Sequence, residues 1–177
     1  MALPIKRIAA GLAAATALGL GSAFSLVDKF EGNVNTIYKD PLGVRTICRG
    51  TTSGPLITKG KATDGECDAA TLKDLQVAAA TVGACVEVPL TDGERNAWTS
   101  FAYNLGPGKR GVKDGMCVLK SGALPSHVRL LAAGKHRAAC HMMAQWTMPG
   151  TSVHKGLVAR RTAEMTLCLR DLPKEAL

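Results

Sequence analysis

The longest uncharged stretch of the chain lies near its N-terminus, where residues 8–27 carry no acidic or basic side chain. A helix of about 20 residues is long enough to span a hydrocarbon core of roughly 30 Å. Ala, Gly, Ser and Thr fill 13 of these 20 positions, so the predicted helix is only weakly hydrophobic. Lys6 and Arg7 precede it and favour an N-terminus on the inner side of a membrane. The remainder of the chain is then expected outside the inner membrane.

Three interpretations of this segment are open. Gly21-Ser22-Ala23 resembles the small-residue cleavage site of a secretory signal. A permanent anchor fits less well with a helix so rich in Ala and Gly. We favour a third interpretation, in which the helix enters the bilayer uncleaved and later leaves it because its insertion is only marginally favourable. The chain is accordingly divided into a membrane segment, residues 1–27, and a body, residues 28–177.

Beyond this segment, the spacing of apolar residues predicts helices and one short hairpin. The apolar pattern through Phe30 is helical and ends at Gly32. Asp40-Pro41-Leu42-Gly43 is typical of a tight turn, and residues 44–48 are expected to form the strand after it. Strict alternation would then define two faces of that strand: Val44, Thr46 and Cys48 on one, and Arg45, Ile47 and Arg49 on the other.

The second half of the chain reads as a series of helices. One is expected from Thr63-Asp64-Gly65-Glu66 through Val82, and Thr91 and Glu94 have the spacing of a capping box. The apolar stripe after this box is expected in the core: Ala97, Trp98, Phe101 and Leu105. Residues 107–123 are expected to form a loop, and residues 136–146 and 153–169 helices. In the last helix the expected place of Arg160 and Arg161 is a solvated face, beside Glu164 or against an anionic wall.

Two carboxylates flank the predicted junction of helix and hairpin. Glu31 is expected at the helix end near Phe30 and Tyr38, an apolar setting that raises a carboxyl pKa and suits a general acid. Asp40 opens the turn and is expected to be hydrated and to face Thr46, so that the two can hold a water. Two carboxylates in unlike settings suit a division between acid and base.

The residues around this pair resemble a known family. Glu31-Gly32, Tyr38-Lys39-Asp40, Gly43 and Thr46-Ile47 are similar to the catalytic segment of the phage-type lysozymes of glycoside hydrolase family 24. The similarity continues through residues 98–106 (WTSFAYNLG) and 156–164 (GLVARRTAE), and so covers nearly all of residues 28–172. It implies a catalytic triad of Glu31 as proton donor, Asp40 as base or electrostatic partner, and Thr46 as the residue that helps to place water.

The resemblance also implies a fold and an activity. The expected fold is α+β and mostly α: two lysozyme-like lobes, one with a small β-hairpin, a long helix between them and a weakly hydrophobic N-terminal helix. The expected enzyme is a monomeric endolysin that hydrolyses β-1,4 bonds between N-acetylmuramic acid and N-acetylglucosamine in peptidoglycan and so causes host cell lysis.

Certain phage endolysins begin with a signal-arrest-release segment, which matches the interpretation favoured for residues 8–27. The expected location is the host inner membrane, with the N-terminus inside and the C-terminus outside, and then the periplasm. Because Glu31 follows Val27 by four residues, a tethered Glu31 would lie against the lipid and activity would be held off until release. Residues 1–47 contain no Cys, so refolding of the released helix, rather than a thiol, is the expected switch.

The sequence departs from the family at Cys48-Arg49-Gly50-Thr51-Thr52, where many relatives carry Gly-x-Gly-His. The departure leaves the triad intact and changes the packing expected beside it.

Six cysteines form an even set, typical of disulfides in an oxidising compartment: Cys48, Cys67, Cys85, Cys117, Cys140 and Cys168. Fifteen pairings are possible and spacing does not choose among them, while free buried thiols would fit a cytosolic protein. Positions like Cys48, Cys67, Cys140 and Cys168 recur among the lysozyme-like relatives. The resemblance thus implies Cys48–Cys67 and Cys140–Cys168, with Cys85–Cys117 as the remaining pair.

The net charge of +8 suits a polyanionic partner such as an acidic cell-wall polymer. No nucleic-acid motif is visible, and the four His residues show no paired ligand spacing, so neither nucleic acid, a metal nor another cofactor is expected. Two other functions remain open: a cationic protein that disrupts wall or membrane without hydrolysis, and a lytic transglycosylase.

Overall fold

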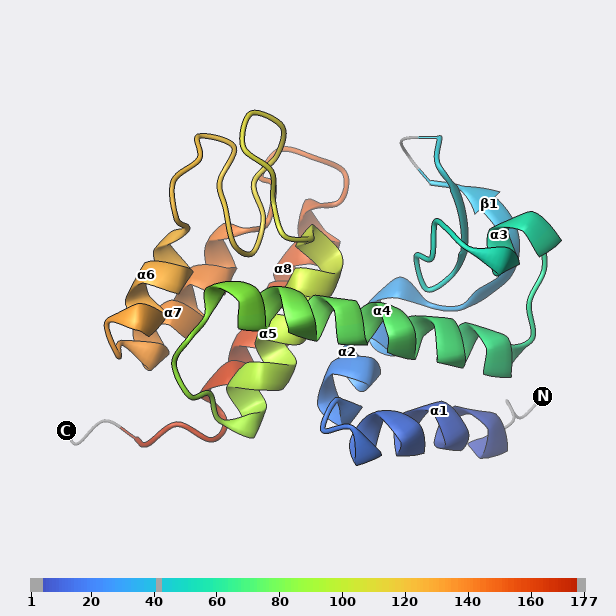
Figure 1. The fold of residues 1–177 in the computed structure, drawn as a ribbon, viewed down its shortest axis with the longest axis horizontal. Helices are drawn as coiled ribbons and strands as arrows, with labels where there is room; N and C mark the ends of the chain where they lie inside the picture. Colours follow the sequence, from blue (N-terminus) through green and yellow to red (C-terminus); the bar gives the residue numbers. More distant parts are fainter. Residues whose placement is uncertain (1–4, 41–42, 175–177) are drawn as a thin grey trace. The chain divides into compact units, whose positions relative to one another are not determined.

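The computed structural model describes residues 5–40 and 43–174, with side chains from residue 11 onward. The chain divides into two compact units, Met1–Gln76 and Val77–Leu177. The elements follow one another as α1 (Ile5–Ala17), α2 (Gly21–Glu31), β1 (Val34–Lys39), β2 (Arg45–Cys48), α3 (Pro55–Lys59), α4 (Asp64–Cys85), α5 (Asp92–Leu105), α6 (Ser126–Ala132), α7 (His136–His141), the 3-10 helix η1 (Met142–Gln145) and α8 (His154–Leu169) (Figure 1). The unit boundary falls within α4, and the predicted mostly helical fold with one small hairpin is confirmed.

The uncharged N-terminal stretch folds as two helices. Helix α1 ends at Ala17, Gly19 adopts a left-handed conformation (φ 70°), and α2 begins at Gly21. The two helices pack against each other, and Ala23, Phe24 and Val27 of α2 are buried. Within the part of the chain that the structure describes, no helix combines the length and the apolar character needed to cross a membrane. The stretch expected as one helix is therefore interrupted after Ala17.

A two-stranded antiparallel sheet and its disulfide form the rest of the first unit. Strands β1 and β2 pair with Val34 opposite Cys48 and Tyr38 opposite Thr46. The disulfide Cys48–Cys67 joins the end of β2 to the first turn of α4. Ile47 and the two half-cystines are fully buried and make a small core beneath the hairpin.

The predicted alternation along β2 holds only at its start. Thr46, Ile47, Cys48 and Arg49 are all buried, so both expected faces are covered. The reason is local: Cys48 has a left-handed backbone (φ 59°), which ends the regular strand and turns the next residue inward. Arg49 therefore lies beyond the regular strand, and burial does not distinguish the two predicted faces.

Helices α5 and α8 carry the core of the second unit. The predicted capping box is confirmed: the Thr91 side chain accepts from the Glu94 N–H, and the Glu94 carboxylate accepts from the Thr91 N–H at 2.9 Å. Trp98 and Phe101 lie in the core as predicted, with ring centroids 5.4 Å apart. His127 stacks on Trp98 at 5.0 Å.

Arg160 and Arg161 are buried, which corrects the expectation that they lie on a solvated face. Both bind the fully buried Glu164, at 3.0 Å from Arg160 Nε and 2.6 Å from Arg161 Nη1. Ser100 donates a hydrogen bond to the same carboxylate at 2.7 Å. These arginines therefore neutralise a buried acid and are withdrawn from any outer surface.

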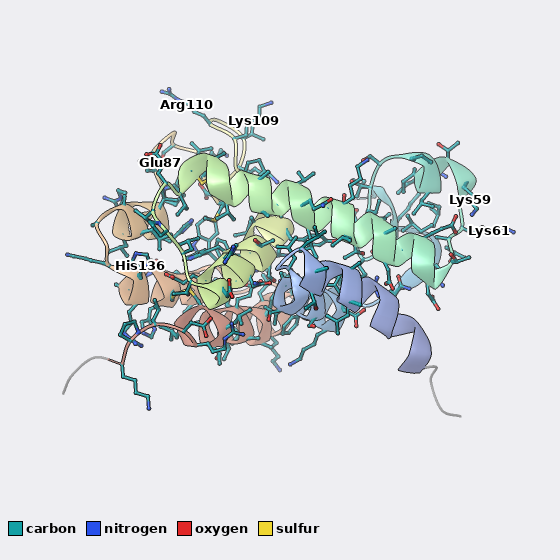
Figure 2. All side chains as sticks on the ribbon, turned by 60° about the horizontal axis from the view of Figure 1, so that its bottom comes forward. Lys59, Lys61, Glu87, Lys109, Arg110 and His136 are labelled. Atoms are coloured by element: carbon teal, nitrogen blue, oxygen red, sulfur yellow. A yellow bond between two sulfur atoms is a disulfide. The ribbon has the colours of Figure 1, made fainter. Side chains whose placement is uncertain are left out.

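The remaining two disulfides lie in the second unit. Cys85–Cys117 fastens the loop after α5 to the end of α4, and Cys140–Cys168 joins α7 to α8. With Cys48–Cys67, all three pairs implied by the family resemblance are confirmed. Basic side chains are left at the surface, among them Lys59 and Lys61 in the first unit and Lys109 and Arg110 in the second (Figure 2).

Candidate active site

Glu31 is the last residue of α2, and Gly32 ends the helix with a φ of 66° that favours glycine. The buried Phe24 and Val27 fix the inner face of this helix. The Glu31 side chain is half-buried at the point where the chain leaves the helix for β1. The helix end and its glycine stop are as the sequence predicts.

Asp40 follows β1 and binds the residues that precede β2 through both its backbone and its side chain. Its N–H donates to the Val44 carbonyl at 3.0 Å, and its carbonyl accepts from the Gly43 N–H at 2.9 Å. The carboxylate oxygen Oδ1 accepts from the Val44 N–H at 2.8 Å. Pro41 and Leu42 of the predicted turn lie outside the described residues. The carboxylate is thus oriented by the backbone of the strand that follows it.

Thr46 lies two residues along that strand and is buried. Its hydroxyl donates to the Val44 carbonyl at 3.0 Å. Because a hydroxyl has one proton and two lone pairs, the Thr46 oxygen can still accept a hydrogen bond. Thr46 pairs with Tyr38 across the sheet, so it lies diagonally across the hairpin from Asp40. The Asp40 carboxylate and the Thr46 hydroxyl both bond to the backbone of Val44, the first to its N–H and the second to its carbonyl. That the two side chains hold a water between them stays a prediction.

Tyr38 brings the predicted site residues into one neighbourhood. Burial raises the pKa of the Tyr38 phenol above its ordinary value, and the negative charges of Glu31 and then Asp40 raise that pKa further. Both carboxylates are therefore close enough to Tyr38 to act on its charge. Tyr38 also lies opposite Thr46 in the sheet, so all three predicted site residues are neighbours of this tyrosine.

Sequence reasoning treated Tyr38 only as a packing neighbour of Glu31 and missed this central place. The signal was available, because Tyr38 precedes Asp40 by two residues and alternate residues of a strand share a face. Glu31 and Asp40 are both half-buried. In residues 5–40 and 43–174, no group of three or more His, Cys, Asp or Glu side chains is arranged to hold a metal ion.

The departure from the family pattern after Thr46 has a structural counterpart. Thr51 belongs to this segment, and its hydroxyl donates to Asp74 Oδ2 at 2.9 Å. Burial raises the pKa of Asp74. The hydrogen bond ties the strand end to α4 within the first unit.

Comparison with known proteins adds an independent line of observation. The family model described as phage lysozyme matches residues 28–164. A SAR-endolysin of Pseudomonas phage phiKMV is 35% identical over 154 residues, covering 85% of this chain and 88% of the relative. A SAR-endolysin of Enterobacteria phage P21 is 31% identical over 142 residues, covering 80% of this chain and 79% of the relative. The crystal structure of the active form of the P1 phage endolysin Lyz is 21% identical with a TM-score of 0.71, covering 93% of this chain and 97% of that one.

The hairpin, the helical second unit and the site sequence thus define a glycoside hydrolase of the lysozyme type. The chain belongs to the phage lysozyme family.

Proposed function

We propose that this enzyme is an endolysin whose reaction centre is formed by Glu31, Asp40 and Thr46. Its substrate is the glycan of peptidoglycan, and it hydrolyses the β-1,4 bond between N-acetylmuramic acid and N-acetylglucosamine. The observation that carries the proposal is the placement of Glu31 at the end of α2, directly before the hairpin on which the Val44 backbone orients Asp40 and Thr46. Membership of the phage lysozyme family and relatives named SAR-endolysin support it.

Each residue has a role that fits its surroundings. Glu31 donates its proton to the glycosidic oxygen, so that the leaving sugar departs as an alcohol. Asp40 stays ionised and stabilises the positive charge that develops on the other sugar, or takes the proton of the attacking water. The hydrogen bond from the Val44 N–H orients the carboxylate for either role.

Thr46 steers the water through the lone pairs that its bond to Val44 leaves available. The water oxygen bonds to the anomeric carbon as the bond to the leaving oxygen breaks, and the water proton passes to the base. A separation of roughly 6.5–9.5 Å between the two carboxyl groups would give inversion, and about 5 Å would give retention.

The products of digestion test the reaction type. Hydrolysis of purified peptidoglycan by the full chain is expected to release one reducing end for each bond cut. A lytic transglycosylase would instead leave anhydro-muramyl ends, and has no evident use for Asp40 and Thr46. A cationic protein acting without hydrolysis would release neither product, so mass analysis of the soluble fragments separates the three functions.

The same proposal extends to the membrane. Before release, residues 8–27 lie in the host inner membrane with the N-terminus inside and the body outside, and after release the monomeric enzyme works in the periplasm. The lack of charge in residues 8–27 and the names of the relatives support this. Packing of α1 against α2 gives the released residues a folded alternative to the bilayer.

A further inference from the structure

Arg49 belongs to the segment that departs from the family pattern, and its side chain is almost entirely buried. A buried guanidinium is costly unless every face of it is partnered. Two carboxylates, a hydroxyl and an aromatic ring meet it here, all within the first unit. Such a complete set of partners points to a specific role in holding elements together.

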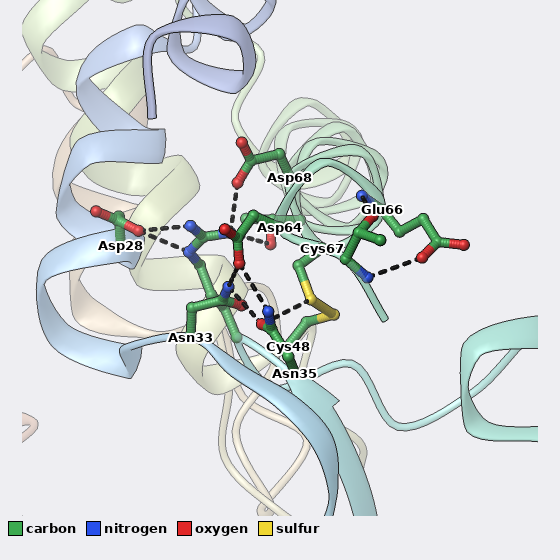
Figure 3. A network of polar contacts seen from close by, with 11 residues as sticks. Asp28, Asn33, Asn35, Cys48, Asp64, Glu66, Cys67 and Asp68 are labelled. Atoms are coloured by element: carbon green, nitrogen blue, oxygen red, sulfur yellow. Dashed lines mark hydrogen bonds and ion pairs between the residues drawn. A yellow bond between two sulfur atoms is a disulfide. The ribbon is translucent and has the colours of Figure 1, made fainter. Parts of the chain in front are cut away.

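On one side Arg49 contacts α2. Its Nε and Nη2 both lie 2.7 Å from Oδ1 of Asp28 (Figure 3). Its guanidinium carbon lies 5.3 Å from the ring centroid of Phe24. Phe24 and Asp28 are four residues apart and so share one face of the helix. Arg49 therefore contacts α2 at two successive helical turns, one at Phe24 and one at Asp28.

On the other side Arg49 contacts α4. Its Nη1 donates to Oδ1 of the buried Asp68 at 2.8 Å and reaches the Thr71 hydroxyl at 3.5 Å. Cys48, which precedes Arg49, and Cys67, which precedes Asp68, are joined by a disulfide (Figure 3). The guanidinium is thus itself anchored, by an ion pair and a covalent bond one residue away.

A second contact lies on the other side of Glu31. Asn35 donates to Oδ1 of Asp64 at 2.7 Å, and Asn33 donates to the same oxygen at 3.3 Å (Figure 3). Asp64 begins α4. In the sequence, Glu31 therefore lies between two attachments to the first turns of α4: one from Asp28 through Arg49 to Asp68, and one from residues 33–35 to Asp64.

We propose that Arg49 is a positioning residue for Glu31. Arg49 binds Asp28 in the last turns of α2 and Asp68 in α4. These contacts fix the axial position and the rotation of the helix end that carries Glu31. The inference rests on the proposed role of Glu31 as the acid. Asp28 precedes Glu31 by three residues, less than one helical turn, so movement at Asp28 is transmitted to Glu31 almost undiminished.

The contacts of Arg49 with Asp28 and Asp68 also explain how release from the membrane could make the enzyme catalytically active. Asp28 and Phe24 belong to or adjoin the stretch proposed to leave the membrane, whereas Arg49 and Asp68 belong to the body. The contacts with α2 can form only when that helix has docked. Glu31 is thus placed by the same event that completes the partners of Arg49.

The test compares Asp28→Asn, Arg49→Gln and the double variant as full-length released chains, with kcat and KM measured on purified peptidoglycan. A displacement of about 1 Å at a reacting group can cost about a hundredfold in rate. Each single variant is therefore expected to lower kcat by about ten- to a hundredfold while KM changes by less than about twofold. Because both substitutions remove the same Asp28–Arg49 ion pair, the double variant is expected to be no slower than the slower single variant.

Two controls separate positioning from general stability. Lys29→Gln changes the exposed neighbour of Asp28 and is expected to keep wild-type kcat. Thr51→Val removes the Thr51–Asp74 hydrogen bond of the same unit without touching α2, and shows what a loss of stability alone does to kcat. Arg49→Lys retains one charge but cannot bind both carboxylates in Arg geometry, and is expected to fall between wild type and Arg49→Gln.

Wild-type kcat in folded Asp28→Asn, or losses that multiply in the double variant, would overturn the proposal. Asp28 is partly exposed, so its variant remains informative even where Arg49→Gln fails to fold. Glu31→Gln is assayed in parallel. Full activity in that variant would refute the proposed function itself, whereas an inactive Glu31→Gln beside an unaffected Asp28→Asn would refute only the positioning role.

Discussion

The phenol of Tyr38 lies within the field of two carboxylates, and burial and both charges raise its pKa further above the neutral pH at which a phenol is already protonated. A neutral phenol can donate a hydrogen bond, which an ionised one cannot. Opposite it, Thr46 is held by the Val44 carbonyl, and Asp40 by the Val44 N–H. At the scale of single residues, one peptide segment thus orients two of the three proposed catalytic side chains.

His127 provides a residue-scale prediction on pH. Burial lowers its pKa to about 4, although its Nε2 donates to the Met116 carbonyl at 2.9 Å. The unfolded chain takes up a proton below its ordinary pKa of 6.5, whereas the folded chain does so only near 4. Stability is therefore expected to fall by up to about 3 kcal/mol as pH drops from about 6.5 to about 4.

Urea unfolding of wild type and His127→Gln at several pH values measures this effect. Gln can still donate to the Met116 carbonyl but does not titrate. The variant is expected to lose less stability between pH 7 and pH 4 than wild type does. Equal losses in both proteins would show that other groups set the acid sensitivity.

Among single residues, local signals were predictable and tertiary ones were not. The capping box of Thr91 and Glu94 depends on residues three apart, and the sequence alone identifies it. Arg160 and Arg161 looked like solvated charges because the α5 residues that they contact, Ser100 and Asn104, lie 60 and 57 residues away in the sequence. Burial of such pairs depends on how helices pack, which spacing does not reveal.

At the scale of elements, α1 approaches α4 closely at Gly11. A Cβ on Gly11 would lie 2.6 Å from Oδ2 and 2.7 Å from Cβ of Asp68, too close for an unshifted structure. Asp68 is the anchor of Arg49. Packing of α1 on α4 therefore requires a glycine at position 11. Gly11 lies against Asp68, whose ion pair with Arg49 also anchors α2.

Gly11→Val is expected to separate membrane insertion from docking. Valine is more apolar than glycine, so recovery of the chain with the membrane fraction before release is expected to be undiminished. In the released chain, overpacking against Asp68 is expected to lower the free energy of unfolding by about 1–3 kcal/mol and to reduce lytic activity. Ala13→Val, at an exposed position of the same helix, is the matched control.

Fractionation, thermal unfolding and lysis assays on both variants provide the measurements. Released Gly11→Val with the stability and activity of Ala13→Val would contradict the packing described for α1. Loss of Gly11→Val from the membrane fraction would contradict the proposed insertion of residues 8–27.

The elements themselves were only partly predictable. The hairpin followed from its turn residues, but its regular alternation ends at Cys48, where the backbone turns left-handed. The uncharged residues 8–27 give no sequence signal strong enough to fix the break near Gly19, because Ala, Gly and Ser are compatible with one helix or two. Packing of α1 on α2 decides it.

At the scale of the whole molecule, each disulfide closes a loop inside one unit, with sequence separations of 19, 32 and 28 residues. Loops of this size stabilise a fold by about 3–4 kcal/mol each. Their pairing was predictable only through resemblance to a family, since spacing leaves fifteen choices. The bonds suit a protein that works in an oxidising compartment.

The fold class and the proposed triad could be inferred from sequence because the family's motifs lie in order along most of the chain. The contacts of Arg49 could not, because its partners Asp28 and Asp68 lie 21 and 19 residues away on two different helices. Only the folded first unit brings them to one guanidinium.

The most direct test of the account is the rate at which Glu31→Gln releases reducing ends from purified peptidoglycan. The substituted amide has nearly the shape of the acid but no proton to give to the leaving oxygen, so the rate is expected to fall by at least about a hundredfold. The melting temperature is expected to stay close to that of wild type, because Glu31 is only half-buried. A folded Glu31→Gln that cuts peptidoglycan at the wild-type rate would contradict the assignment of Glu31 as the acid.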